Sequence, residues 1–257
     1  MTLAHSMFLG LLRGITEFIP VSSDGHEMLA RTLLKVERPS AAFDVLLHAA
    51  SLLAILIYFR REILSVFTIR RYLIPVLIVG TVPVAIVGGF YQQQIVALLD
   101  SPVAVGIGLI ATGTALRLGE YFATDQRTLD ELTIGDALFV GVAQAFALAP
   151  GVSRAGMTLS SGLGRGLERN TAVAFSFLLG AMAILGAAVV RCKDGIEVGA
   201  RSDWGTMAAG FAVALVASFA SLVLLGDLAR HKRLAWCGIY CYLVGAAVLL
   251  AKLFAVW

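Results

Sequence analysis

Six apolar stretches, each close to the length of a bilayer-spanning helix, most constrain the fold of this 257-residue chain. A transmembrane helix needs about 20 predominantly apolar residues. The stretches are Phe43–Phe59, Tyr72–Tyr91, Pro102–Leu118, Ala172–Val190, Trp204–Leu228 and Leu234–Trp257. Apolar residues make up 59% of the chain and charged residues 14%, whereas a soluble domain has about 45–50% and about 25%. The sequence therefore predicts one all-α polytopic membrane domain over residues 1–257, and argues against a soluble enzyme or a nucleic-acid-binding protein.

Two further apolar stretches, Leu3–Pro20 and Ile134–Pro150, are too short or too interrupted to span a bilayer. Each runs into a proline that is followed by serine and glycine residues. Broken helices of this kind are tolerated in a membrane only where protein surrounds them or where they line a cavity. The sequence thus predicts two re-entrant helical hairpins in addition to the spanning helices.

The two short stretches also resemble each other, which predicts an internal repeat. Pro20-Val-Ser-Ser23 and Pro150-Gly-Val-Ser153 lie about half the chain apart. Downstream of them, Phe43, Leu46, Leu47 and Ala49 recur as Phe175, Leu178, Leu179 and Ala181. We expect two repeats, residues 1–125 and 126–257, of inverted topology, with a site near the membrane midplane where the interrupted segments meet.

The distribution of arginine and lysine residues predicts the orientation, because cytoplasmic loops are enriched in both. The loops placed inside hold Arg60, Arg61, Arg70, Arg71, Arg117, Arg127, Arg165, Arg169, Arg230, Lys232 and Arg233. The loops placed outside hold fewer, namely Arg31, Lys35, Arg38, Arg191, Lys193 and Arg201. Both termini then lie on the non-cytoplasmic side.

Polar residues gather where the first short stretch ends. They are Arg13, Glu17, Ser22, Ser23, Asp24 and His26. Arg13 and Glu17 are four residues apart, so they share one helix face. They either form an intrahelical salt bridge or belong to a water-accessible polar site. Charged groups inside membrane segments are costly and usually functional.

The second short stretch carries Ser153, Arg154 and Thr158 beside two glycines. A helix that begins here would direct backbone N–H groups at an anion. The alternative is an ordinary serine N-cap with an arginine that reaches the membrane surface. Taken together, the two segments offer a nucleophile, a base, carboxylates and a group that binds anions. These are the groups that phosphoryl transfer requires. Burial in a membrane predicts a phosphate carried on a lipid.

At these residues the chain resembles the undecaprenyl-diphosphate phosphatase family, the bacitracin-resistance proteins of bacterial inner membranes. The resemblance covers nearly the whole chain. Its strongest segments are Gly14-Ile-Thr-Glu-Phe-Ile-Pro-Val-Ser-Ser-Asp-Gly-His26, Pro150-Gly-Val-Ser-Arg-Ala-Gly-Met-Thr158, and Phe43-Asp-Val-Leu-Leu-His-Ala-Ala-Ser51 running into Tyr58-Phe-Arg60. The resemblance implies removal of one phosphate from the lipid diphosphate, which recycles the carrier for peptidoglycan synthesis, and an inverted-repeat fold with re-entrant helices.

The resemblance also implies roles for individual residues. Glu17 belongs to the acidic motif, Ser23 is the nucleophile, and His26 is its base or acid partner. The diphosphate-binding residues are Arg154, Ser153 and Thr158, to which Ser22 and Arg13 are added. The family uses Mg²⁺ or Ca²⁺, for which Glu17 and Asp24 are the expected ligands.

Three positions depart from the family pattern. Arg13 stands where Glu or Gln is usual, Asp24 replaces a threonine, and Ala155 replaces the last serine of the Pro-Gly-x-Ser-Arg-Ser motif. Arg13 either pairs with Glu17 or points at the diphosphate as a second clamp. We expect the second arrangement, and with it a weakened dependence on Mg²⁺ or Ca²⁺.

Two functions of different classes follow. The first is a membrane phosphatase acting on undecaprenyl diphosphate, and the second is a non-catalytic protein that binds or translocates polyprenyl phosphates. The expected partners are the polyprenyl diphosphate lipid and the bilayer, with a homodimer as one option and no nucleic acid. The expected location is the bacterial inner membrane, with the site facing its periplasmic side.

Overall fold

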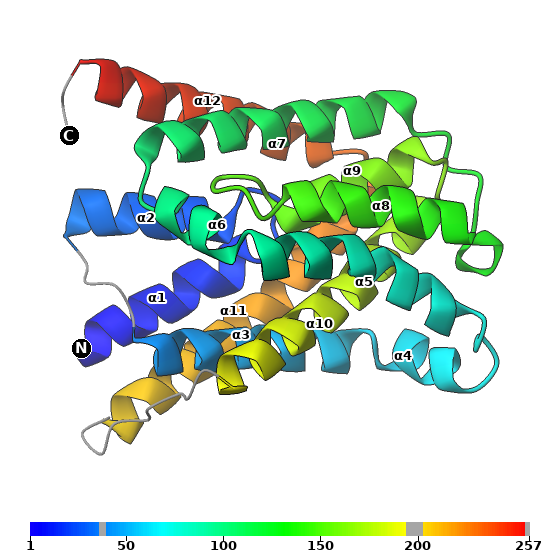
Figure 1. Ribbon diagram of the computed structural model, residues 1–257, viewed down its shortest axis with the longest axis horizontal. Coiled ribbons are helices and arrows are strands. Elements are labelled where there is room, and N and C mark those ends of the chain that lie inside the picture. The colour runs from blue at the N-terminus through cyan, green and yellow to red at the C-terminus, as the bar shows by residue number, and fades with distance from the viewer. Residues whose placement is uncertain (36–39, 194–202, 255–257) are drawn as a thin grey trace.

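The computed structural model describes residues 1–35, 40–193 and 203–254, which form a bundle of helices (Figure 1). The α-helices are α1 (Leu3–Thr16), α2 (Ser23–Leu34), α3 (Ala41–Tyr58), α4 (Arg60–Phe67), α5 (Leu73–Phe90), α6 (Gln92–Leu98), α7 (Pro102–Phe122), α8 (Ile134–Phe146), α9 (Arg154–Gly164), α10 (Arg169–Lys193), α11 (Trp204–Arg230) and α12 (Leu234–Leu253). A 3-10 turn, η1 (Leu129–Glu131), precedes α8. The predicted outer-loop residues Arg38 and Arg201 lie outside the described residues.

Within the described part of the chain, six helices are long and apolar enough to cross a membrane. They are α3, α5, α7, α10, α11 and α12. The prediction of an all-α polytopic membrane protein with about six spanning helices is therefore confirmed. Large apolar side chains such as Ile78, Ile107 and Val216 are exposed on these helices, as a lipid-facing surface requires. Helix α7 continues past the predicted end at Leu118 to Phe122, because a helix need not stop where its apolar run stops.

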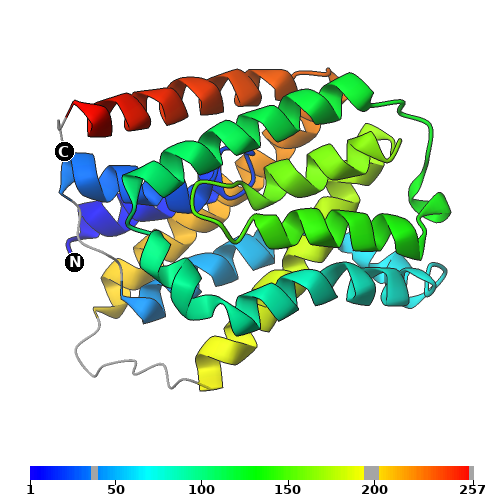
Figure 2. The same ribbon diagram turned by 45° about the horizontal axis from the view of Figure 1, so that its top comes forward.

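The two short apolar stretches form helices of 14 and 13 residues, α1 and α8, which are shorter than a spanning helix. Each is followed by a turn and then by a second short helix, α2 or α9, that runs back along it (Figures 1 and 2). The two hairpins enter the bundle from opposite ends, and their turns lie in its middle (Figure 2). The re-entrant position of these hairpins in a bilayer stays a prediction.

The first helix of each hairpin packs against a long helix from the other half of the chain. Helix α1 contacts α11, and α8 contacts α5. Glycines allow both crossings, since a Cβ on Gly10 would lie 3.1 Å from the carbonyl carbon of Gly210 and one on Gly141 would lie 3.0 Å from Cα of Gly80. The two crossings are alike, although the division into repeats at residues 1–125 and 126–257 stays a prediction.

Candidate active site

Glu17 lies at the tip of the first hairpin, where it caps the C-terminus of α1. Its side chain is 9% exposed. The next residue, Phe18, is fully buried and packs on Phe177 of α10, with ring centroids 5.3 Å apart. Phe59 stacks on the same ring, with a centroid distance of 5.9 Å. This aromatic cluster anchors the chain directly after Glu17 and thereby holds its carboxylate in the middle of the bundle.

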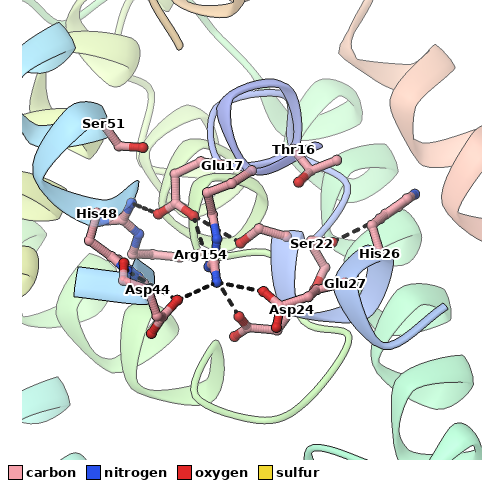
Figure 3. A network of polar contacts seen from close by, with 12 residues as sticks. Thr16, Glu17, Ser22, Asp24, His26, Glu27, Asp44, His48, Ser51 and Arg154 are labelled. Atoms are coloured by element: carbon pink, nitrogen blue, oxygen red, sulfur yellow. Dashed lines mark hydrogen bonds and ion pairs between the residues drawn. The ribbon is translucent and has the colours of Figure 1, made fainter. Parts of the chain in front are cut away.

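The Glu17 carboxylate joins residues from both hairpins (Figure 3). Ser23, the first residue of α2, donates a hydrogen bond from Oγ to Oε2 of Glu17 at 2.9 Å. Arg154, the first residue of α9, donates from Nη2 to Oε1 at 2.8 Å. The structure therefore brings together the predicted nucleophile, the predicted acidic residue and the predicted diphosphate ligand.

Ser22 gives the turn of the first hairpin its shape. Its φ of 71° lies in the left-handed region, which non-glycine residues seldom adopt and which clusters at functional sites. Its side chain accepts a hydrogen bond from the backbone N–H of Gly25 and so caps α2. Ser22 is buried, so its predicted contact with substrate stays a prediction.

His26 makes its hydrogen bonds away from Ser23. Its Nδ1 lies 2.8 Å from the carbonyl oxygen of Ser22, and its Nε2 lies 2.7 Å from the hydroxyl of Tyr240 on α12. Because a carbonyl only accepts, Nδ1 carries the proton, and Nε2 of the neutral ring accepts from Tyr240. The ring stacks on Tyr240 and points away from Glu17 (Figure 3). Sequence reasoning missed Tyr240, which lies 214 residues from His26.

Arg13 is buried, and its guanidinium lies among carboxylates from α2 and α3. It donates to Glu27 at 2.7 Å, to Asp44 at 2.8 Å and to Asp24 at 3.3 Å. Glu17 is farther away, at 3.8 Å. The predicted ion pair between Arg13 and Glu17 is therefore present, but it is the longest of these four contacts. The alternative, in which Arg13 is a second clamp on the diphosphate, stays a prediction.

Glu27 and Asp44 were absent from the predicted site. Glu27 follows Ser23 by four residues on α2, so the shared helix face is a signal that locates it from sequence. Asp44 comes from α3, and its side chain is half-buried beside His48 (Figure 3). No local pattern connects Asp44 with Arg13, because only the packing of α3 against α1 brings the two together.

In the second hairpin, the hydroxyl groups mainly support the backbone. Ser153 caps α9 by accepting a hydrogen bond from the N–H of Gly156 at 3.1 Å, and its own N–H donates to Thr112 at 2.8 Å. Thr158 is buried and bonds the carbonyl of Arg154 and the hydroxyl of Ser176. Diphosphate binding by Ser153 and Thr158 stays a prediction.

The guanidinium of Arg154 fits into a space left by Gly180 of α10. A Cβ on Gly180 would overlap Nη1 of Arg154 and lie 3.1 Å from its Cζ. Nη1 is buried and has no hydrogen-bond partner among the described residues. Gly180 therefore leaves the space that the guanidinium of Arg154 occupies, a role that no sequence motif suggested.

The carboxylates of the first hairpin and of α3 do not form a ligand set for a divalent cation. Glu17 is bonded to Ser23 and Arg154, while Asp24, Glu27 and Asp44 are directed at Arg13. Within the described ranges, no group of three or more His, Cys, Asp or Glu side chains has the geometry of a metal site. The expected ligands Glu17 and Asp24 thus do not fit a metal while Arg13 keeps its position.

Chemically, the arrangement pairs a hydroxyl nucleophile with a carboxylate that can take its proton. A carboxylate within hydrogen-bond distance is positioned to act as a general base. Arg154 adds a planar cation suited to phosphate oxygens. These groups lie between helices that cross a membrane, so a substrate with an apolar chain and a phosphate headgroup matches the surroundings.

Comparison with known proteins identifies the family. Residues 6–247 match the family model described as bacitracin resistance protein BacA. A protein of Carboxydothermus hydrogenoformans named undecaprenyl-diphosphatase is 37% identical over 96% of this chain and 97% of its own. Proteins of the same name from Syntrophotalea carbinolica and Rhodopirellula baltica are 37% and 36% identical, over 95% and 98% of this chain and 97% and 98% of theirs. The chain therefore belongs to the BacA family of bacitracin resistance proteins.

Proposed function

We propose that this protein is an integral-membrane phosphatase that hydrolyses undecaprenyl diphosphate to undecaprenyl phosphate and inorganic phosphate. The observation that carries the proposal is the Glu17 carboxylate, which accepts hydrogen bonds from both Ser23 and Arg154. The names of the relatives support the same activity. A protein that only bound or moved the lipid would need the arginine but would not need a serine hydroxyl paired with a carboxylate.

The proposed reaction begins at Ser23. Its Oγ attacks the terminal phosphorus while its proton passes to Glu17, and the bond from that phosphorus to the bridging oxygen breaks. The lipid monophosphate leaves, and a phosphoserine remains. Water then attacks the phosphorus of the phosphoserine, and the bond from that phosphorus to Oγ of Ser23 breaks. Oγ takes back the proton held by Glu17, and the water oxygen leaves as part of inorganic phosphate. Arg154 binds the negatively charged oxygens of the transferring group, which is where charge stabilisation lowers the barrier most.

Glu17 is the base in this scheme because it contacts Ser23, whereas His26 contacts Ser22 and Tyr240. The role of His26 as acid or base partner stays a prediction. No step passes through Mg²⁺ or Ca²⁺, since Arg13 engages the carboxylates that would bind such an ion. The expected homodimer also stays a prediction.

The proposed location is the inner membrane of a bacterium, with the site open to the periplasmic side. The six apolar helices and the arginine-rich loops assigned to the cytoplasm support this orientation. In this position the lipid chain of the substrate stays in the bilayer while its diphosphate reaches the hairpin tips.

The test is phosphate release by the purified protein in detergent, with C15 and C55 polyprenyl diphosphates as substrates. We expect turnover of both by the wild type and none by Ser23→Ala. Ser161→Ala is the matched control, because the Ser161 hydroxyl only bonds backbone carbonyls within α9. Lipid binding without phosphate release by the wild type would favour the non-catalytic alternative and contradict the proposal.

A further inference from the structure

The surroundings of Arg13 have a charge pattern that the proposed reaction does not explain. The Arg13 side chain is 6% exposed, and Asp24, Glu27 and Asp44 all lie within hydrogen-bond distance of its two terminal nitrogens. The three carboxylates come from α2 and α3, so they were brought to this guanidinium by tertiary packing. The three carboxylates thus surround one buried guanidinium, which binds all of them.

The carboxylates depend on this cation. Glu27 and Asp44 are largely buried, with exposed fractions of 17% and 18%. Buried carboxylates of like charge repel one another and are costly unless a positive group pairs with them. Arg154 donates from Nη2 to Glu17 instead. Arg13 is therefore the guanidinium that all three carboxylates share in the folded protein.

A guanidinium and a divalent cation exclude each other at this position. Mg²⁺ and Ca²⁺ need several oxygens at about 2.0–2.6 Å around one point. Here the carboxylate oxygens lie 2.7 to 3.3 Å from guanidinium nitrogens, and the guanidinium fills the space between them. An arginine also stays protonated at any physiological pH, so the charge that it provides needs neither a bound ion nor a particular pH.

We infer that Arg13 is the resident cation of this site, that it takes the place of a divalent metal ion, and that the substrate-free protein binds no divalent cation there. The expected effect on turnover rests on the proposed function, whereas the expected effect on metal binding does not. A further consequence concerns the carboxylates themselves: without the arginine, Asp24, Glu27 and Asp44 lose the cation that they share, and their oxygens can act as ligands to a metal ion.

The test is Mn²⁺ binding, measured by electron paramagnetic resonance on the full-length protein in detergent without substrate. Mn²⁺ prefers oxygen ligands, as Mg²⁺ and Ca²⁺ do. We expect the wild type to bind Mn²⁺ no better than Arg13→Lys, which keeps the positive charge. Arg13→Met should bind Mn²⁺ at least about tenfold more tightly than the wild type, because a buried positive charge has been removed. Adding Asp44→Asn to Arg13→Met should abolish the gain. Arg70→Met, which removes a cation paired with Asp130 elsewhere, should leave Mn²⁺ binding unchanged.

Two results would overturn the inference. One is tight Mn²⁺ binding by the wild type that Asp44→Asn removes, a measurement that needs no Arg13 variant to fold. The other is a folded Arg13→Met that binds Mn²⁺ no more tightly than the wild type. In turnover, the wild type should keep its activity in EDTA, and complete loss there would also count against the inference. Mn²⁺ binding is measured without catalysis, so failure of the proposed phosphatase activity leaves this test intact.

Discussion

Arg154 and Glu17 lie 137 residues apart in the sequence, yet their side chains form an ion pair at 2.8 Å that connects the two hairpins. The ion pair engages both Arg154, which would bind the phosphate oxygens, and Glu17, which would take the proton of Ser23. A substrate oxygen that takes the place of Glu17 on Arg154 would free the carboxylate to act on Ser23. Substrate binding and activation of the nucleophile would then be a single exchange of partners.

The first prediction is that Arg154→Ala abolishes turnover and that Arg154→Lys does not restore it well. Loss of one partner from a buried charged contact costs about 2–5 kcal/mol, or roughly 30- to 4,000-fold in kcat/KM. A lysine provides charge but no planar fork for two phosphate oxygens. Phosphate release from C15 diphosphate, measured over a range of substrate concentrations, checks both variants.

The control for Arg154 is Arg60→Ala, since the Arg60 guanidinium donates to the carbonyl of Ile57 at an exposed helix end. Arg60→Ala should turn over as the wild type does. Near-wild-type kcat/KM in a folded Arg154→Ala would mean that Arg154 only packs between the hairpins.

The second prediction concerns Tyr240, which we expect to be a positioning residue for His26. The Tyr240 hydroxyl donates to Nε2 and fixes the ring orientation. One such hydrogen bond contributes about 0.5–1.5 kcal/mol, so Tyr240→Phe should lower kcat up to about tenfold and leave KM nearly unchanged. Steady-state kinetics of the folded variant give both constants.

A double-variant comparison distinguishes positioning from packing. If Tyr240 acts through His26, then Tyr240→Phe adds no loss in a His26→Ala background. Tyr242→Phe on the same helix is the matched control, because it loses a hydroxyl bonded to Thr114 and should keep its activity. Equal, additive losses from Tyr240→Phe in both backgrounds would refute the connection.

Much of the fold follows from the sequence because apolar length is a local property. Each spanning helix needs its own run of apolar residues, and the six runs are visible without knowledge of their neighbours. The short hairpin helices were predictable for the same reason, since Pro20 and Pro150 follow runs too short to span. Helix ends were less accurate, as the extension of α7 to Phe122 illustrates.

The site was only partly predictable, because several of its contacts are tertiary. The family motifs locate Glu17, Ser23 and Arg154, but nothing in them places Tyr240 against His26 or Asp44 against Arg13. The role of Gly180 is the hardest to predict from sequence, since Gly180 acts only by having no side chain where the Arg154 guanidinium lies. Residues that act by leaving room or by crossing between helices have no local pattern to reveal them.

The third prediction is that Gly180→Ala reduces activity by displacing Arg154. A Cβ at residue 180 would overlap Nη1, so the guanidinium must shift. A displacement of about 1 Å in a catalytic arrangement can cost about a hundredfold in rate. We expect kcat/KM to fall by that order while the thermal midpoint in detergent changes little, because the flexible end of the arginine moves rather than the backbone.

Gly186→Ala on the same helix is the control, since a Cβ there meets nothing within 4 Å. It should leave kcat/KM unaltered. In an Arg154→Ala background, Gly180→Ala should cause no further loss, because the displaced group is gone. A large additional loss in that background would indicate that Gly180 acts on the packing of α10 instead.

The fourth prediction concerns Asp136, a fully buried carboxylate in the first turn of α8. Burial raises the pKa of Asp136, but hydrogen bonds from Arg127, Thr133 and Arg165 outweigh burial and hold the pKa below its ordinary value. A carboxylate with a lowered folded-state pKa stabilises the protein above its unfolded pKa of about 3.9. This stabilisation is lost as the pH falls through the lower folded-state value.

Asp136→Asn should therefore lower the free energy of unfolding at pH 7 by roughly 3 kcal/mol, because it leaves two arginines without their shared carboxylate. The difference from the wild type should shrink as the pH is lowered past about 4, since the wild type then loses the same charge. Thermal unfolding in detergent at several pH values measures this. Asp130→Asn is the control: Asp130 pairs with Arg70 at an exposed position, and exposed pairs contribute about 0–1 kcal/mol. A constant difference between Asp136→Asn and the wild type down to pH 3 would mean that the carboxylate stabilises α8 by its shape and not by its charge.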